Sequence, residues 1–103
     1  MSTIGTMAIK VVVEFTAKPG KRGELGHVLE EIIAKHGAGT PGYLGSTRFE
    51  VLEQPDMLVE LADWESVETR NAHMKAAADT GVFAPLTELM AAPFRVTVIR
   101  ALA

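Results

Sequence analysis

Four runs of β-branched and apolar residues alternate with two helical patterns, and this order restricts the chain to very few folds. The runs predict strands because they are short, apolar and bounded by turn residues. They lie at residues 9–16, 43–53, 57–64 and 94–100. The second and third runs are separated only by Gln54-Pro55-Asp56, which predicts an antiparallel hairpin. The order β-α-β-β-α-β predicts an α+β fold of the ferredoxin-like type.

The two helical patterns differ in strength. In the first, apolar residues recur three and four positions apart, which is typical of one buried helix face. They are Leu25, Val28, Leu29, Ile32 and Ile33. The second helix is expected to start at a Ser66 cap and to stop at Gly81. It carries Val67, Asn71, Met74 and Ala78. A further short helical piece is expected with Pro85 in its first turn.

Composition sets the class of protein. The chain has 103 residues, which is the size of one domain, and we expect that domain at 8–103 after a flexible tail at 1–7. A net charge of −3 without a basic block argues against nucleic-acid binding. No apolar run is long enough to cross a membrane, and no secretory signal is recognisable at the start. Because cysteine is absent, we expect neither disulfides nor a thiolate metal site, and a cytoplasmic location.

The predicted strands are apolar on both faces, although the chain has helices enough for one face only. The first strand places Val12 opposite Val11 and Val13, and the last places Ile99 opposite Val98. A sheet face exposed to water is normally polar at alternate positions. We therefore expect a second copy of the chain to cover the open face, in a two-fold homodimer.

These features together resemble the antibiotic biosynthesis monooxygenase family, over about residues 8 to 101. The similar pieces are residues 11–25 (VVVEFTAKPGKRGEL), Trp64-Glu65-Ser66 followed by Ala72-His73, and residues 89–99 (LMAAPFRVTVI). The resemblance implies a dimeric α+β barrel with a pocket between helices and sheet in each subunit. It also implies oxidation of a quinol or polycyclic phenol by O2 with no flavin or metal cofactor, because the deprotonated ring of the substrate activates the oxygen.

At some positions this chain has other residues than the haem-degrading and quinol-oxidising members of the family. Val13 and His73 stand where haem-degrading relatives have Asn and Trp, and residues 83–87 supply no His, which disfavours haem degradation. Quinol-oxidising relatives often carry a second His a few residues after the first. Residues 76–83 contain none, so a histidine pair is reduced to one residue.

His73 is the predicted catalytic residue, because a neutral imidazole can accept a phenolic proton. Trp64 is the predicted pocket wall for a flat substrate, with a purely structural role as the alternative. The other predicted substrate-binding residues are Arg48, Glu60, Met74 and Phe83. Arg48 and Glu60 are also expected to pair, either across the hairpin or across the dimer. With three scattered His, no metal site is expected.

Three functions stay open from the sequence. The first is a cofactor-independent monooxygenase acting on a small aromatic substrate. The second is a non-redox isomerase on the same scaffold, with His73 as acid or base. The third is a non-catalytic dimeric small-molecule-binding or stress-related protein.

Overall fold

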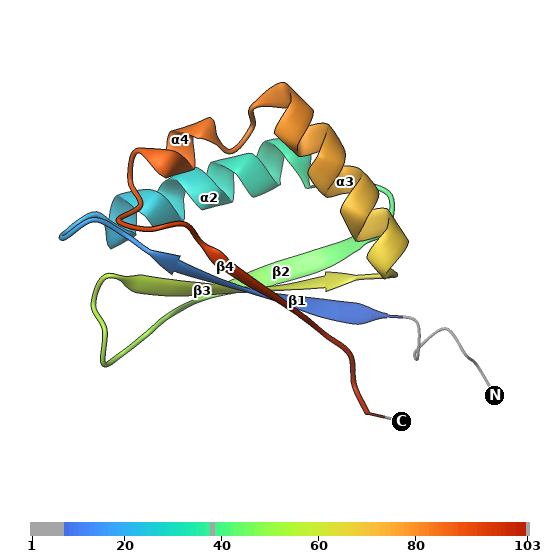
Figure 1. The fold of residues 1–103 in the computed structure, drawn as a ribbon, viewed down its shortest axis with the longest axis horizontal. Helices are drawn as coiled ribbons and strands as arrows, with labels where there is room; N and C mark the ends of the chain where they lie inside the picture. The colour runs from blue at the N-terminus through green and yellow to red at the C-terminus, as the bar shows by residue number, and fades with distance from the viewer. Residues whose placement is uncertain (1–7, 38, 103) are drawn as a thin grey trace.

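A four-stranded antiparallel sheet forms one layer of the molecule, and the helices form the other. The computed structural model describes residues 8–37 and 39–102, so the tail expected at 1–7 lies outside the described residues. The strands are β1 (Ile9–Thr16), β2 (Tyr43–Glu50), β3 (Met57–Trp64) and β4 (Arg95–Ile99). The helices are α2 (Arg22–His36), α3 (Val67–Thr80) and the short α4 (Ala84–Thr87). In Figure 1 all three helices lie on the same side of the sheet.

The strand order is β2-β3-β1-β4, with every neighbouring pair antiparallel. This is the arrangement expected of β-α-β-β-α-β connectivity, so the predicted α+β ferredoxin-like fold is confirmed. β1 and β3 are the central strands, and Ile9 lies opposite Trp64 in their register. A second copy of the chain is not part of the structure, so the homodimer stays a prediction.

The predicted element boundaries are close to the observed ones. β1 and β3 span the predicted residues, whereas β2 ends at Glu50 instead of residue 53. The reason is the hairpin turn, where the Val51 amide donates to the Met57 carbonyl and the Gln54 amide donates to the Val51 carbonyl. These hydrogen bonds curl residues 51–56 into a turn before the apolar run of sequence has finished.

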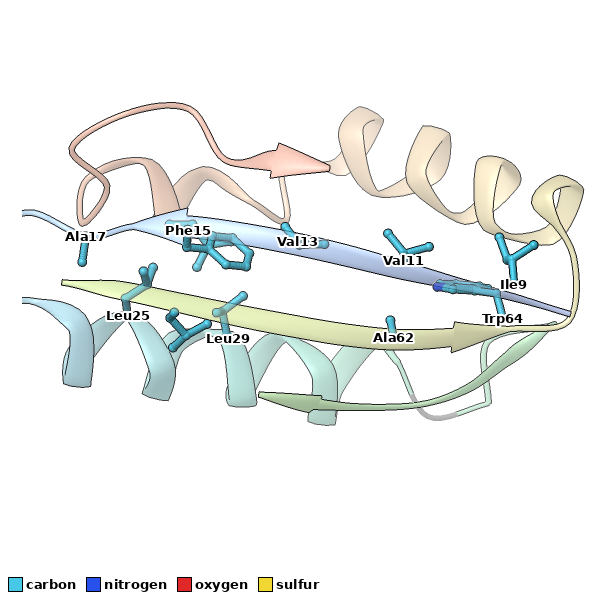
Figure 2. Close-up of a cluster of buried hydrophobic side chains, with 11 residues drawn as sticks. Ile9, Val11, Val13, Phe15, Ala17, Leu25, Leu29, Ala62 and Trp64 are labelled. Carbon is cyan, nitrogen blue, oxygen red and sulfur yellow. The ribbon is translucent and has the colours of Figure 1, made fainter. Parts of the chain in front are cut away.

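The core lies between β1, β3 and α2. Alternate residues of β1 face the helices and are almost fully buried, from Ile9 to Phe15. Figure 2 shows these side chains in a row, with Trp64 and Ile9 at one end of the cluster and Ala17 and Leu25 at the other. Burial of this apolar surface is the main force that holds α2 against the sheet.

The two faces of the sheet are covered unequally. On the helix side, Val96 and Val98 of the edge strand β4 stay 36% and 44% exposed. On the opposite face, Val12, Val59 and Leu61 are only half-buried, and Ile99 is exposed. No described helix is long and apolar enough to cross a membrane.

Candidate functional site

A cavity of about 100 Å³ lies between the sheet and the helix layer. Its floor consists of side chains from all four strands, and its roof comes from α2, α3, α4 and the segment that leads into α4. Most of the lining is apolar. The polar residues that line it are His36, Tyr43, Ser46, Glu60, Arg70 and His73. The cavity is therefore an apolar chamber with a small number of hydrogen-bonding groups, which is the usual composition of a small-molecule site.

An aromatic row crosses one wall of the cavity. The Tyr43 and Trp64 rings are 5.3 Å apart at an interplanar angle of 62°, and the Trp64 and His73 rings are 5.3 Å apart at 39°. Tyr43 and Trp64 lie opposite each other in the β2–β3 register, and α3 supplies His73. Such tilted contacts fix the rings against one another. The imidazole is thereby held at the cavity wall.

The position of α3 depends on its first turn. The Ser66 hydroxyl accepts a hydrogen bond from the Thr69 amide at 3.2 Å, which confirms the predicted cap. Thr69 also packs against Gly42, where a Cβ atom would lie only 2.3 Å from the Thr69 hydroxyl oxygen. Gly42 has a φ of +83°, a conformation that also favours glycine. A bare glycine in the loop before β2 therefore lets the start of α3 approach the sheet.

His73 is half-buried, and its surroundings favour the neutral imidazole. Burial lowers the pKa of His73, and the positive charges of His36 and Arg70 lower it further. At neutral pH the ring therefore carries one free nitrogen lone pair, which can accept a proton from a ligand. This is the protonation state that a general base requires.

Glu60 is the acidic group of the cavity. It lies directly opposite Arg48 in the β2–β3 register, with an Arg48 Nη1 to Glu60 Oε2 distance of 3.9 Å. The predicted cross-hairpin pair is therefore confirmed. Burial raises the pKa of the Glu60 carboxyl above its usual range, and the Arg48 charge only partly opposes this effect. The protonated form of this carboxyl is therefore favoured more than in an exposed glutamate.

Five of the six predicted site residues line one cavity. They are Glu60, Trp64, His73, Met74 and Phe83. Arg48 is not part of the lining, but its guanidinium contacts Glu60 and donates a long hydrogen bond of 3.4 Å to the Ser46 hydroxyl. The roles predicted for these residues stay predictions, since no ligand is part of the structure.

The sequence-based prediction did not select the remaining polar lining. Tyr43 and Ser46 had no visible partner in the sequence, yet their hydroxyls share a hydrogen bond of 2.6 Å in the structure. A β-bulge at Tyr43 and Gly45 brings them together, and nothing in the sequence fixes such a shift of register. Arg70 was detectable, because it lies three residues before His73 and therefore on the same face of α3. Among the described residues, no three acidic or histidine side chains converge as a metal site would need.

Comparison with known proteins adds a family. The family model described as antibiotic biosynthesis monooxygenase matches residues 8–79. This segment runs from the start of β1 almost to the end of α3 and includes Glu60, Trp64 and His73. No curated protein matches the sequence significantly.

Several solved structures share the fold over nearly the whole chain. A conserved protein from Methanosarcina mazei Go1 has a TM-score of 0.81 at 21% identity, covering 97% of this chain and 98% of that one. Rv0793 from Mycobacterium tuberculosis has a TM-score of 0.76 at 23% identity, covering 93% and 96%. A variant of SnoaB, a cofactor-independent oxygenase from Streptomyces nogalater, has a TM-score of 0.77 at 17% identity, covering 91% and 92%. At these identities the likeness establishes the fold alone.

Proposed function

The chain belongs to the antibiotic biosynthesis monooxygenase family, and from that premise we propose that it is a cofactor-independent monooxygenase of quinols or related phenols. The observation that carries the proposal is the neutral His73 imidazole at the end of an aromatic row, inside an apolar cavity. A structurally similar protein, SnoaB, is described as a cofactor-independent oxygenase, which is consistent with this chemistry on the same fold.

His73 is the proposed proton acceptor. A phenol that stacks against Trp64 presents its hydroxyl to the neighbouring imidazole, whose ring centroid lies 5.3 Å from that of Trp64. Transfer of the hydroxyl proton to His73 leaves a phenolate in an apolar chamber. There the anion is poorly solvated, which favours its oxidation. Met74 and Phe83 complete the apolar wall.

The overall reaction balances without a further reductant. A quinol supplies all four electrons that reduce O2. One oxygen atom replaces a ring hydrogen and the other leaves as water, so the products are a hydroxyquinone and one water molecule. The protein contributes the proton acceptor and holds the ring and O2 together, and such positioning accounts for a large part of many rate enhancements.

The cavity size bears on the substrate. An engineered protein cavity of about 150 Å³ accommodates benzene, and the present cavity is about 100 Å³. A single ring is therefore the upper limit for the observed shape. A bicyclic quinol requires side chains of the wall to rotate, and Met74 is the most adaptable of these because its side chain is unbranched.

The homodimer is part of the proposal. It rests on the half-buried apolar residues of the open sheet face, among them Val12, Val59 and Leu61. Packing of two such faces removes this surface from water and leaves the helix side, with its cavity, accessible to substrate. The cytoplasm is the proposed location, because a chain without cysteine shows no adaptation to an oxidising compartment.

Oxygen uptake in the presence of reduced benzoquinols and naphthoquinols tests the proposed function. We expect the wild type to exceed the uncatalysed rate and His73→Ala to lose most of the gain. His27→Ala is the matched control, since His27 is exposed on α2 and does not line the cavity. The proposal fails if the wild type matches the uncatalysed rate across the panel, or if both variants are equally active.

Non-redox proton transfer is the second candidate function. It is favoured by the presence of Glu60 and His73 in one cavity, with pKa values shifted in opposite directions from their usual values. Two such groups can deliver a proton to one atom and remove it from another. Substrate conversion without oxygen uptake would identify this activity, and binding without any conversion would identify a carrier protein.

A further inference from the structure

Two polar atoms in the cavity wall have no hydrogen-bond partner. They are Glu60 Oε2 on β3 and Arg70 Nε on α3, and both atoms are fully buried. Both residues line the same cavity. Buried polar atoms are satisfied in the great majority of cases, so each exception calls for an explanation.

Neighbouring side chains do not satisfy either atom. Arg48 Nη1 stands 3.9 Å from Glu60 Oε2, which is an ion-pair distance but too long for a hydrogen bond. Arg70 makes no salt bridge to any carboxylate of residues 8–37 and 39–102. A guanidinium that is half-buried among apolar side chains without a counter-charge is unfavourable in the free protein.

The other hydrogen-bonding groups of the wall are differently placed. The Tyr43 and Ser46 hydroxyls bond to each other at 2.6 Å, so each already has a partner. Glu60 and Arg70 therefore remain, beside His36 and His73 in the same lining, as an acceptor and a donor without a partner. A ligand that satisfies both must offer a hydroxyl to the carboxylate and an oxygen acceptor to the guanidinium.

We propose that the cavity selects single-ring phenols that carry a second, oxygen-acceptor group, a carboxylate or a carbonyl. One phenolic hydroxyl donates to Glu60 Oε2, and Arg70 Nε donates to the acceptor oxygen. In a quinol substrate the second hydroxyl is the one that faces His73. The ring packs on Trp64, which lines the same cavity. This inference rests on the proposed function for the identity of the site, but it concerns recognition and does not require turnover.

Ligand titration followed by NMR tests the inference directly. The chain has one Trp, so a single indole N–H resonance reports occupancy of the cavity wall. The probes are 4-hydroxybenzoate and 4-hydroxyacetophenone, which carry both groups, against phenol and benzoate, which carry one each. We expect the two bifunctional probes to bind about ten- to hundredfold more tightly than phenol, the usual effect of one charge-assisted hydrogen bond. A preference for 4-hydroxybenzoate over 4-hydroxyacetophenone would identify the acceptor as a carboxylate, and the reverse order as a carbonyl.

Two variants assign the groups. Arg70→Met should weaken 4-hydroxybenzoate at least tenfold and leave phenol within about twofold, whereas Glu60→Met should weaken phenol and leave benzoate unchanged. Arg22→Met and Glu50→Met are the matched controls, because these residues form an ion pair with a distance of 3.2 Å outside the cavity lining. They should change no affinity.

The inference is overturned if 4-hydroxybenzoate and 4-hydroxyacetophenone bind the wild type no more tightly than phenol. That comparison needs no variant, so it stands even if a substitution prevents folding. It is also overturned if Arg70→Met weakens phenol and 4-hydroxybenzoate by the same factor, since that result indicates lost packing. The titration measures binding and consumes no oxygen, so its result does not depend on turnover. Tight, selective binding without oxygen uptake would support this inference and contradict the proposed oxidation.

Discussion

Replacement of Arg48 by Met should destabilise the protein in a manner that depends on pH. The substitution keeps the apolar stem of the side chain but removes the cation 3.9 Å from Glu60 Oε2. The Glu60 side chain is only 15% exposed, so water replaces little of the lost interaction. In the folded variant, the carboxylate must either stay charged without a counter-ion or take up a proton.

Proton uptake by Glu60 sets the upper limit of the loss in stability. At an effective dielectric constant of about 20, two unit charges at this separation interact by about 4 kcal/mol. Protonation of the carboxylate costs less than this. A carboxyl group whose pKa is 4.5 in the unfolded chain takes up a proton at a cost of about 1.4 kcal/mol for each pH unit above 4.5. The limit is therefore about 3.4 kcal/mol at pH 7 and about 0.7 kcal/mol at pH 5. Because the folded variant can protonate Glu60, its loss of stability cannot exceed the cost of protonation.

The sign follows from proton binding. Loss of Arg48 raises the pKa of Glu60 in the folded state still further above its unfolded value. Between the two values the folded protein binds more protons than the unfolded chain, so stability falls as the pH rises through this window. The loss caused by Arg48→Met should thus be small near pH 5 and grow towards pH 7.

Urea unfolding at pH 5, 6 and 7 measures the effect, at one protein concentration because subunit association would also contribute. The double variant Arg48→Met/Glu60→Gln should show no added loss between pH 5 and 7. Arg22→Met, whose partner Glu50 is 64% exposed, should cost at most about 1 kcal/mol at every pH. The reasoning is refuted if Arg48→Met costs the same at pH 5 and pH 7, or if the double variant keeps the pH dependence.

Three further predictions concern the imidazole, the core and the open face. Because the pKa of His73 is lowered in the folded state, His73→Gln should raise the melting temperature more at pH 5 than at pH 7.5, and an equal shift would contradict this. Leu86→Ala and Leu25→Ala should each lower the free energy of unfolding by about 3–5 kcal/mol, since both side chains are buried. Only Leu86 lines the cavity, so an NMR titration should show stronger naphthol binding in Leu86→Ala alone. Leu61→Lys, on the open face, should shift sedimentation from dimer to monomer, whereas Leu52→Lys in the exposed hairpin turn should not; two unchanged dimers would argue against the proposed interface.

The strands and the first helix were predictable because the burial of apolar side chains dominates their formation. β1 alternates buried and less buried residues with a period of two, as its apolar pattern indicates. α2 buries Leu25 and Leu29, both members of the predicted apolar stripe. Where local hydrogen bonds compete with the pattern, as at residues 51–53, prediction was wrong about the end of the strand.

The site was predictable in part. Glu60 could be chosen because a charged residue stands there in an otherwise apolar strand, whereas Trp64 and His73 were chosen from the resemblance to the family. The contribution of Tyr43 and Ser46 depends on a bulge of the backbone, and the sequence carries no local signal for its position. Contacts between residues far apart in the chain, such as that between Gly42 and Thr69, also depend on the final packing of elements.

The second helix explains how so short a chain leaves room for a cavity. Within α3, which the structure describes in full, Ala77 is the sole buried residue, and the Asn71 and Ala78 of the predicted pattern are exposed. The inward face instead presents Arg70, His73 and Met74 to the cavity. The weak apolar pattern of α3 is therefore informative, since departures from the expected local pattern concentrate at functional sites.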